Sequence, residues 1–271
     1  MPPDIAGVEQ ANPKMLASTT PPIIAVVNQK GGVGKTTTAI NLGAALAELG
    51  HRILLVDLDP QANTTSGLGL DPTRARLNVY HLLIGEADLA EVAQPTGVAN
   101  LELVPSHIDL AGAEIELATL DARETLLRKA LSSPPPGIEC VIIDCPPSLG
   151  LLTLNALAAA TGMLIPTQCE YFALEGLRHL MYTHQLMRSS LNPKLVVAGI
   201  VMTQFDARTT LAWDVLESVR RSYPNEILQT LIPRNVRISE APSHGKSVID
   251  YDPTCRGAAA YRALAKELLE R

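Results

Sequence analysis

Residues 28–38 read Asn-Gln-Lys-Gly-Gly-Val-Gly-Lys-Thr-Thr-Thr, and this stretch decides the fold of the chain. It follows an apolar run at residues 23–27 and precedes residues 39–46, whose apolar side chains recur at helical spacing. In this order of strand, glycine-rich turn and helix, Gly-Lys-Thr indicates a phosphate-binding loop. Glycine lets backbone N–H groups point at phosphate oxygens, and the N-terminus of the following helix adds a favourable dipole. The sequence therefore predicts a nucleoside triphosphate site.

Each residue of this loop has an expected role. Lys35 is expected to reach the β- and γ-phosphates, and the hydroxyl of Thr36 is expected to ligate Mg²⁺. The nucleotide-binding residues predicted in this segment are Lys30, Gly31, Gly32, Val33, Gly34, Lys35, Thr36 and Thr37.

The loop also carries an unusual second lysine. The common pattern has a glycine six residues before the loop lysine, but Gln29 stands there and Lys30 follows it. Within its own subunit, Lys30 would only help to neutralise phosphate. Across a dimer interface, it would reach the nucleotide of a second subunit, where an added positive charge is worth about 10³–10⁵ in rate. The second interpretation would couple the nucleotide state to dimerisation.

Acidic side chains end two further apolar runs. Asp57 and Asp59 follow the second run, and strand alternation places them on one face, at the end of the strand where open α/β sheets bind ligands. Such a pair either holds Mg²⁺ through water or orients the attacking water; Asp59 could instead cap the next helix. Asp144 ends another run, as Walker B acids do, and is expected to bind Mg²⁺ through a water.

Apolar runs alternate with helical patterns beyond residue 21, and uninterrupted apolar runs indicate strands buried on both faces. The sequence therefore predicts an α/β fold: a single-domain P-loop NTPase at residues 22–271, with a mostly parallel, twisted sheet and helices on both faces. Residues 1–21 are expected to form a flexible N-terminal tail. Strands are predicted at 23–28, 52–57, 101–104, 139–144, 162–166, 195–202 and 227–232, and helices at 35–49, 78–92, 108–131, 148–160, 173–190, 210–222 and 256–270.

The composition sets limits on the function. Of 271 residues, 46% are hydrophobic, but no apolar run reaches the about 18 residues that span a bilayer, and no secretory signal is visible. The four cysteines are expected to be reduced, and the spacing of Cys140 and Cys145 favours buried structural thiols over a metal site. A net charge of −6 on its own argues against nucleic-acid binding.

Residues 30–37 resemble the deviant Walker A box of the ParA/MinD ATPases. Three further segments narrow the resemblance to the chromosome-partitioning branch, ParA/Soj: residues 55–61, 142–148 and 232–242. The similarity covers about residues 22–270. It implies ATP and Mg²⁺ as cofactors and slow, partner-stimulated hydrolysis of ATP by water.

The resemblance also assigns roles to residues. Asp59 would be the water-positioning residue, and the backbone around Pro233 and Asn235 would read adenine, although the residues alone do not separate ATP from GTP. The implied catalytic residues are Lys30, Lys35 and Asp59, and the implied metal-site residues are Thr36, Asp59 and Asp144.

Binding of DNA is a further implication of the resemblance. The ATP-bound homodimer would bind double-stranded DNA without sequence preference through Arg208 and Arg237, and a ParB-type partner would trigger hydrolysis and release. A dimer doubles the phosphate contacts on one surface, which would let an acidic protein bind DNA. Judged by the residues alone, both arginines also fit an ordinary surface role.

Alternatives concern the cargo and the partners. The same cycle could position a protein cargo or regulate replication initiation instead of moving a chromosome or plasmid. Residues 1–21 could dock a polar scaffold or be an inert tail. No membrane association is expected, because the charges of the C-terminal helix are of mixed sign and do not form a basic amphipathic face. The expected location is the cytoplasm, on the nucleoid.

Overall fold

The apolar runs form the strands of one eight-stranded sheet in the computed structural model, which describes residues 21–271. The strand order is β3-β4-β2-β5-β1-β6-β7-β8, and every neighbouring pair is parallel except β3 with β4. The mostly parallel sheet of the sequence prediction is thus confirmed. The strands are β1 (Ile23–Val26), β2 (Ile53–Asp57), β3 (Gln94–Pro95), β4 (Leu101–Val104), β5 (Cys140–Asp144), β6 (Gly162–Gln168), β7 (Val196–Phe205) and β8 (Ile227–Pro233).

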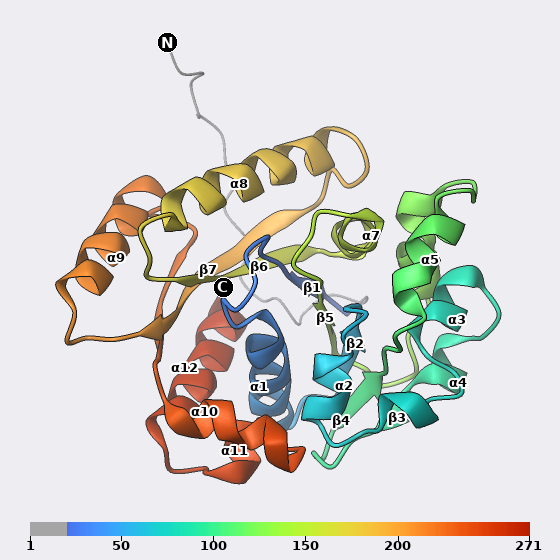
Figure 1. The fold of residues 1–271 in the computed structure, drawn as a ribbon, viewed down its shortest axis with the longest axis horizontal. Helices are drawn as coiled ribbons and strands as arrows, with labels where there is room; N and C mark the ends of the chain where they lie inside the picture. Colours follow the sequence, from blue (N-terminus) through green and yellow to red (C-terminus); the bar gives the residue numbers. More distant parts are fainter. Residues whose placement is uncertain (1–20) are drawn as a thin grey trace.

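Helices cover both faces of the sheet, as predicted (Figure 1). Within β1, Ile24 and Val26 join the apolar core on one face, while Ala25 joins the core on the other, so both faces of the strand are buried. The first face carries α1 (Lys35–Glu48), α10 (Val236–Glu240), α11 (Val248–Tyr251) and α12 (Arg256–Glu270). The second carries α3 (Val79–Ile84), α4 (Leu89–Val92), α5 (Leu110–Leu117), α6 (Leu126–Ala130), α7 (Leu151–Ala159), α8 (Ala173–Ser189) and α9 (Thr210–Ser222).

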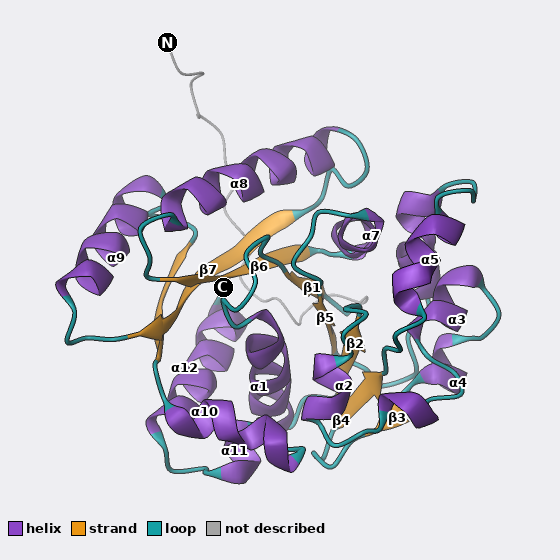
Figure 2. Ribbon diagram, viewed as in Figure 1, coloured by secondary structure: helices purple, strands orange, loops and turns teal. Residues whose placement is uncertain are grey.

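Two of the predicted helices are wrong because the chain breaks inside them (Figure 2). The predicted helix at 78–92 divides into α3 and α4, since Gly85 adopts a left-handed φ of 76° and a second helix then starts after Asp88. The predicted helix at 108–131 ends with α5 and resumes after Ala122, whose φ of 52° is incompatible with a continuous helix. The apolar residues keep a helical spacing across both breaks, so the sequence pattern gives no sign of them.

The topology brings the loops of the predicted site to one edge of the sheet. Strand β1 lies between β5 and β6, and its C-terminal residue Val26 is in register with Asp144 at the end of β5. Asp144 is in turn in register with Asp57 at the end of β2. Because these strands are parallel, the loops that follow β1, β2 and β5 all leave the sheet at its C-terminal edge, where α/β folds bind ligands.

Three further predictions concern the N-terminal tail, membrane spans and the cysteines. The tail predicted at residues 1–21 lies outside the described residues, apart from Pro21. Within residues 21–271 no helix is long and apolar enough to cross a membrane. Cys140 and Cys145 are buried free thiols, as expected. Residues 21–271 contain no group of three or more His, Cys, Asp and Glu side chains arranged for a metal ion.

Candidate nucleotide-binding site

The loop between β1 and α1 has the backbone shape that an anion cradle requires. Gly32 and Gly34 have left-handed φ angles of 75° and 89°, which glycine adopts without strain. A side chain at Gly31 or Gly32 would meet nothing within 4 Å, so this part of the loop faces open space. Helix α1 then starts at Lys35 with no side-chain cap, which leaves N–H groups of its first turn available to a ligand.

Side chains at the ends of neighbouring strands hold the loop in this shape. The Thr203 hydroxyl donates to the Val33 carbonyl over 2.7 Å, and the Gln204 side-chain amide donates to the Gly32 carbonyl over 2.8 Å. Both come from the end of β7, and Gln204 has a left-handed φ of 50°, which is rare for a residue other than glycine. On the other side, the Asn28 amide donates to the Pro166 carbonyl of β6 over 2.7 Å.

Lys35 lies at the centre of the site. Its side chain is buried, and Nζ donates to the Lys30 carbonyl over 3.1 Å, so the cation is held under the loop. Burial lowers the pKa of Lys35, and the carboxylates of Asp144 and Asp59 oppose this shift by favouring the charged form. The lysine predicted to bind phosphate is therefore placed between the loop and the acidic residues.

The acids that end β2 and β5 lie side by side in the interior. Asp144 Oδ2 accepts a hydrogen bond from the Thr64 hydroxyl over 2.8 Å, whereas Oδ1 has no partner among the described residues. Asp57 Oδ2 accepts from the Thr65 backbone N–H and hydroxyl, over 2.8 and 2.7 Å. Burial raises the pKa of both carboxyls, and the nearby Asp144 charge adds to the rise at Asp57. Because burial makes the two negative charges unfavourable on their own, a nearby cation would stabilise the ionised pair.

Asp59 follows β2 and is almost buried, with 8% of its surface exposed. Its Oδ1 accepts from the Gln61 N–H over 2.9 Å, in the turn before α2 (Asn63–Gly67). The N-cap of α2 is Ala62, so Asp59 does not cap this helix and only shapes the turn that leads to it. Its negative charge raises the pKa of both Lys35 and Asp144, so its carboxylate lies near these two residues of the predicted site.

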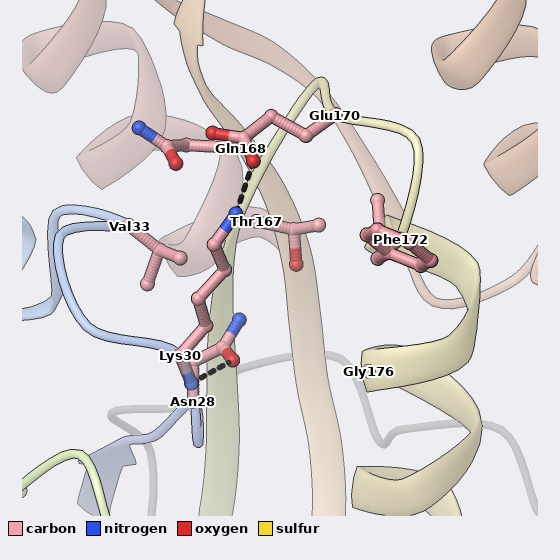
Figure 3. A pocket seen from close by; sticks show the side chains of 9 residues that line it. Asn28, Lys30, Val33, Thr167, Gln168, Glu170, Phe172 and Gly176 are labelled. Carbon is pink, nitrogen blue, oxygen red and sulfur yellow. Dashed lines mark hydrogen bonds and ion pairs between the residues drawn. The ribbon is translucent and has the colours of Figure 1, made fainter.

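Lys30 has a different orientation from Lys35. Its ammonium group forms an ion pair with Glu170, which lies between β6 and α8, and both side chains are half exposed. Figure 3 shows the extended Lys30 side chain beside a hollow that Phe172 also lines. The hollow has a volume of about 30 Å³, enough for a water molecule but not for a nucleotide. The second lysine thus lies at the outer rim of the loop.

The residues predicted to contact adenine and DNA lie at the ends of β7 and β8. Pro233 ends β8, and the Asn235 side chain caps α10 by accepting from the Arg237 N–H over 2.8 Å. Arg208 follows β7 and is paired with Asp206. Arg237 is paired with Glu240 and Asp252. Both arginines thus lie at the edge of the sheet that carries the loop, and each already has an acidic partner.

Sequence reasoning missed several residues of the site. Thr203 and Gln204 hold the loop from β7, where polar residues ending an apolar run are the one available signal. Thr64 and Thr65 tie the two buried acids to α2, a helix too short to show a periodic pattern. Glu170 is separated from Lys30 by 140 residues, and nothing in the sequence pairs them.

The fold and this loop together define the class of the protein: it is a P-loop nucleotide-binding ATPase. The sequence pattern of a family described as an AAA domain matches residues 22–197. The chain is 52% identical over 246 residues to the sporulation initiation inhibitor protein Soj of Bacillus subtilis, covering 91% of this chain and 97% of Soj. It is 50% identical over 249 residues to the chromosome partitioning protein ParA of Myxococcus xanthus, covering 92% and 88% of the two chains.

Solved structures agree with this assignment. A protein of Mycobacterium smegmatis described as cobyrinic acid a,c-diamide synthase, solved with ADP and magnesium, superposes with a TM-score of 0.81 at 40% identity, covering 92% of this chain and 94% of that one. The MinD cell division ATPase of Pyrococcus furiosus gives 0.74 at 27% identity, covering 91% and 98%. The chain belongs to the ParA/Soj family of chromosome-partitioning ATPases.

The contact between β7 and the loop has a measurable consequence. We expect Gln204→Ala to weaken binding of an ATP analogue by about 3- to 10-fold, because a hydrogen bond that fixes the loop is worth about 0.5–1.5 kcal/mol. Calorimetric titration with a non-hydrolysable analogue measures this change.

Gln204→Gly is the matched variant, because it loses the same hydrogen bond but relieves the left-handed backbone. Its affinity for the ATP analogue should fall as far as that of Gln204→Ala. Its free energy of unfolding should be about 1 kcal/mol higher than that of Gln204→Ala. Unchanged affinity in both variants would show that β7 does not hold the loop in its binding shape.

Proposed function

We propose that this protein is an ATP-dependent, dimerising ATPase that binds DNA non-specifically and partitions a chromosome or plasmid together with a ParB-type partner. The single observation that carries the proposal is the arrangement of two lysines in one loop: Lys35 is buried among carboxylates, while Lys30 stands at the exposed rim. Its family membership supplies the biological setting.

The residues fit ATP with Mg²⁺. The open glycine loop and the uncapped start of α1 present N–H groups to phosphates, and Lys35 supplies a cation beside them. The unpartnered Oδ1 of buried Asp144 is the feature that a hydrated Mg²⁺ would satisfy, with the Thr36 hydroxyl as a further ligand. Mg²⁺ would supply charge neutralisation on the phosphates. Asp59 would hold the attacking water, and Pro233 and Asn235 would lie near the adenine ring of ATP.

The position of Lys30 supports the proposed dimerisation. The Lys30 ammonium group is half exposed and pairs with half-exposed Glu170, whereas Lys35 is buried. A second subunit that faced this rim would receive the Lys30 cation at its own nucleotide. DNA would then bind to the dimer through Arg208 and Arg237 of both subunits, which would place the protein on the nucleoid.

Mixing two inactive variants tests whether Lys30 acts across the interface. Lys30→Ala keeps its own Asp59 but lacks the rim lysine, whereas Asp59→Ala keeps Lys30 but lacks the water-positioning acid. We expect each variant alone to hydrolyse ATP at least about 100-fold more slowly than the wild type. In an equimolar mixture, half of the dimers contain one intact composite site, so turnover should recover to as much as about a quarter of the wild-type rate.

The same experiment identifies the alternative. If Lys30 serves the nucleotide of its own subunit, neither subunit of a mixed dimer has a complete site, and the mixture stays as inactive as its components. A mixture of Lys30→Ala with Lys35→Ala is the control for the nucleotide requirement: the Lys35→Ala subunit brings Lys30 but no bound ATP. If the dimer forms only when both subunits hold a nucleotide, the ATP turnover of this control mixture should recover less than that of the Lys30→Ala and Asp59→Ala mixture.

A further inference from the structure

The loops that follow β7 and β8 start side by side, and both carry arginines. Phe205 at the end of β7 is in register with Pro233 at the end of β8, and the Arg234 N–H donates to the Phe205 carbonyl over 3.1 Å. Arg208 follows the first strand, and Arg234 and Arg237 follow the second, so three arginines share this corner. Arg234 is exposed and has no ion pair among the described residues.

Arg208 is held by a two-pronged contact with Asp206. Its Nε donates to Oδ1 over 2.8 Å, its Nη2 donates to Oδ2 over 2.7 Å, and its backbone N–H also donates to Oδ1 over 3.1 Å. The arginine side chain is 86% exposed, so it is accessible to a large ligand although its guanidinium is engaged. Hydrogen bonds from Arg208 lower the pKa of Asp206 to about 2, and Arg234 adds to this effect.

The loop that carries this pair is anchored independently of the pair itself. The Trp213 indole N–H donates to the Ala207 carbonyl over 3.0 Å, and the Trp213 ring packs edge-on against Phe205. The Thr209 N–H donates to the Asp206 carbonyl over 3.1 Å. Because these contacts do not involve the Asp206 carboxylate, its charge can be removed without releasing the loop.

A guanidinium binds a carboxylate and a phosphate with the same planar fork of N–H donors. Asp206 therefore occupies the Nε/Nη2 fork of Arg208, one of the two forks that a DNA phosphate could use. An exposed ion pair of this kind is weak, so phosphate can displace the carboxylate, but only at a cost in affinity. The displaced carboxylate also stays ionised next to the DNA, which adds repulsion.

We propose that Asp206 is an internal competitor for the DNA phosphate at Arg208 and keeps the DNA affinity of each subunit low. Arg237 is restrained by single contacts with two carboxylates, those of Glu240 and Asp252, which leaves Arg234 as the one arginine of this corner without an ion pair among residues 21–271. A single subunit would then bind DNA poorly, and stable binding would require the contacts of two. This inference rests on the proposed DNA-binding function.

The test compares Asp206→Asn with Glu48→Gln, both in a protein that also carries Asp59→Ala to block hydrolysis. Asparagine keeps an oxygen for the Arg208 N–H but loses the charge. Glu48 is the matched control, because it holds Arg262 in the same two-pronged way, over 2.6 and 2.8 Å, at the opposite end of α1 from the loop. Each substitution removes one negative charge from the protein.

Binding to random-sequence duplex DNA is measured with ATP over a series of salt concentrations. Asp206→Asn should bind about 3- to 10-fold more tightly at low salt, and its log–log salt slope should steepen by about 0.9 for each arginine that gains a phosphate contact. Glu48→Gln should leave both quantities near those of the Asp59→Ala protein. With Arg208→Ala also present, Asp206→Asn should no longer steepen the slope, because no guanidinium remains to be freed.

The outcomes separate this inference from the proposed function. If the Asp59→Ala protein binds DNA but Asp206→Asn neither tightens binding nor steepens the slope, the competitor role of Asp206 is wrong while DNA binding stands. The same holds if Glu48→Gln reproduces the gain, because the effect would then be one of net charge. If none of the proteins binds DNA with ATP, the proposed DNA-binding function itself fails.

Discussion

Lys35→Ala should lose ATP binding almost completely. Hydrogen bonds to charged groups are worth about 1.5–3 kcal/mol each, so losing two to the phosphates should raise the Kd for ATP by about 10²–10⁴-fold. The buried position of Lys35 beneath the loop strengthens this expectation, because among residues 21–271 no other lysine lies buried. Calorimetric titration of the variant with an ATP analogue and Mg²⁺ measures the loss.

Two controls accompany this variant. Lys129→Ala removes an exposed lysine from α6 and should leave the Kd unchanged. Because Lys35 lies beside buried carboxylates, thermal unfolding of the nucleotide-free protein must show that Lys35→Ala still folds. A folded Lys35→Ala protein that binds the ATP analogue within a few-fold of the wild type would end the assignment of this loop as a phosphate cradle.

Asp59→Ala should separate ATP binding from hydrolysis. If Asp59 positions the attacking water, its loss should slow turnover by about 10²–10⁴-fold and leave the Kd for an ATP analogue within a few-fold of the wild type. The ATP-dependent dimer that we propose should therefore persist. Phosphate release under multiple turnover and the elution volume in size-exclusion chromatography with ATP measure the two effects.

Asp59→Asn distinguishes the two roles that the structure allows for this residue. Asparagine can still accept the hydrogen bond from the Gln61 N–H, so it preserves the turn before α2 but not the charge. We expect Asp59→Asn to be as inactive as Asp59→Ala. Near-normal turnover in Asp59→Asn with an inactive Asp59→Ala would show that the side chain only supports the turn.

The sequence predicted the sheet and the loop well because strong local signals coincide there. Residues 28–38 combine fixed glycine spacing with a preceding apolar run, and the buried parallel strands read as uninterrupted apolar segments. The helix breaks at Gly85 and Ala122 escaped notice because a single left-handed residue leaves the surrounding apolar spacing intact. Short elements such as β3 and α2 have too few residues to show any period.

The contacts that shape the site were harder to predict because they join distant parts of the chain. The loop is held by Thr203 and Gln204, about 170 residues further on, and the rim lysine pairs with Glu170. Arg208 and Asp206 are close in sequence, but only the structure shows that both oxygens of the carboxylate accept hydrogen bonds from the guanidinium. Sequence patterns report which elements form, whereas such contacts depend on how the elements are assembled.

The most direct test of the central claim is binding to random-sequence duplex DNA by the Asp59→Ala protein without nucleotide, with ADP and with ATP, at two salt concentrations. Arg237→Glu serves as the variant that should dimerise but lose DNA. The account predicts binding with ATP alone, weaker at high salt. Binding in no state, or equal binding in all three, would contradict a nucleotide-gated DNA-binding ATPase.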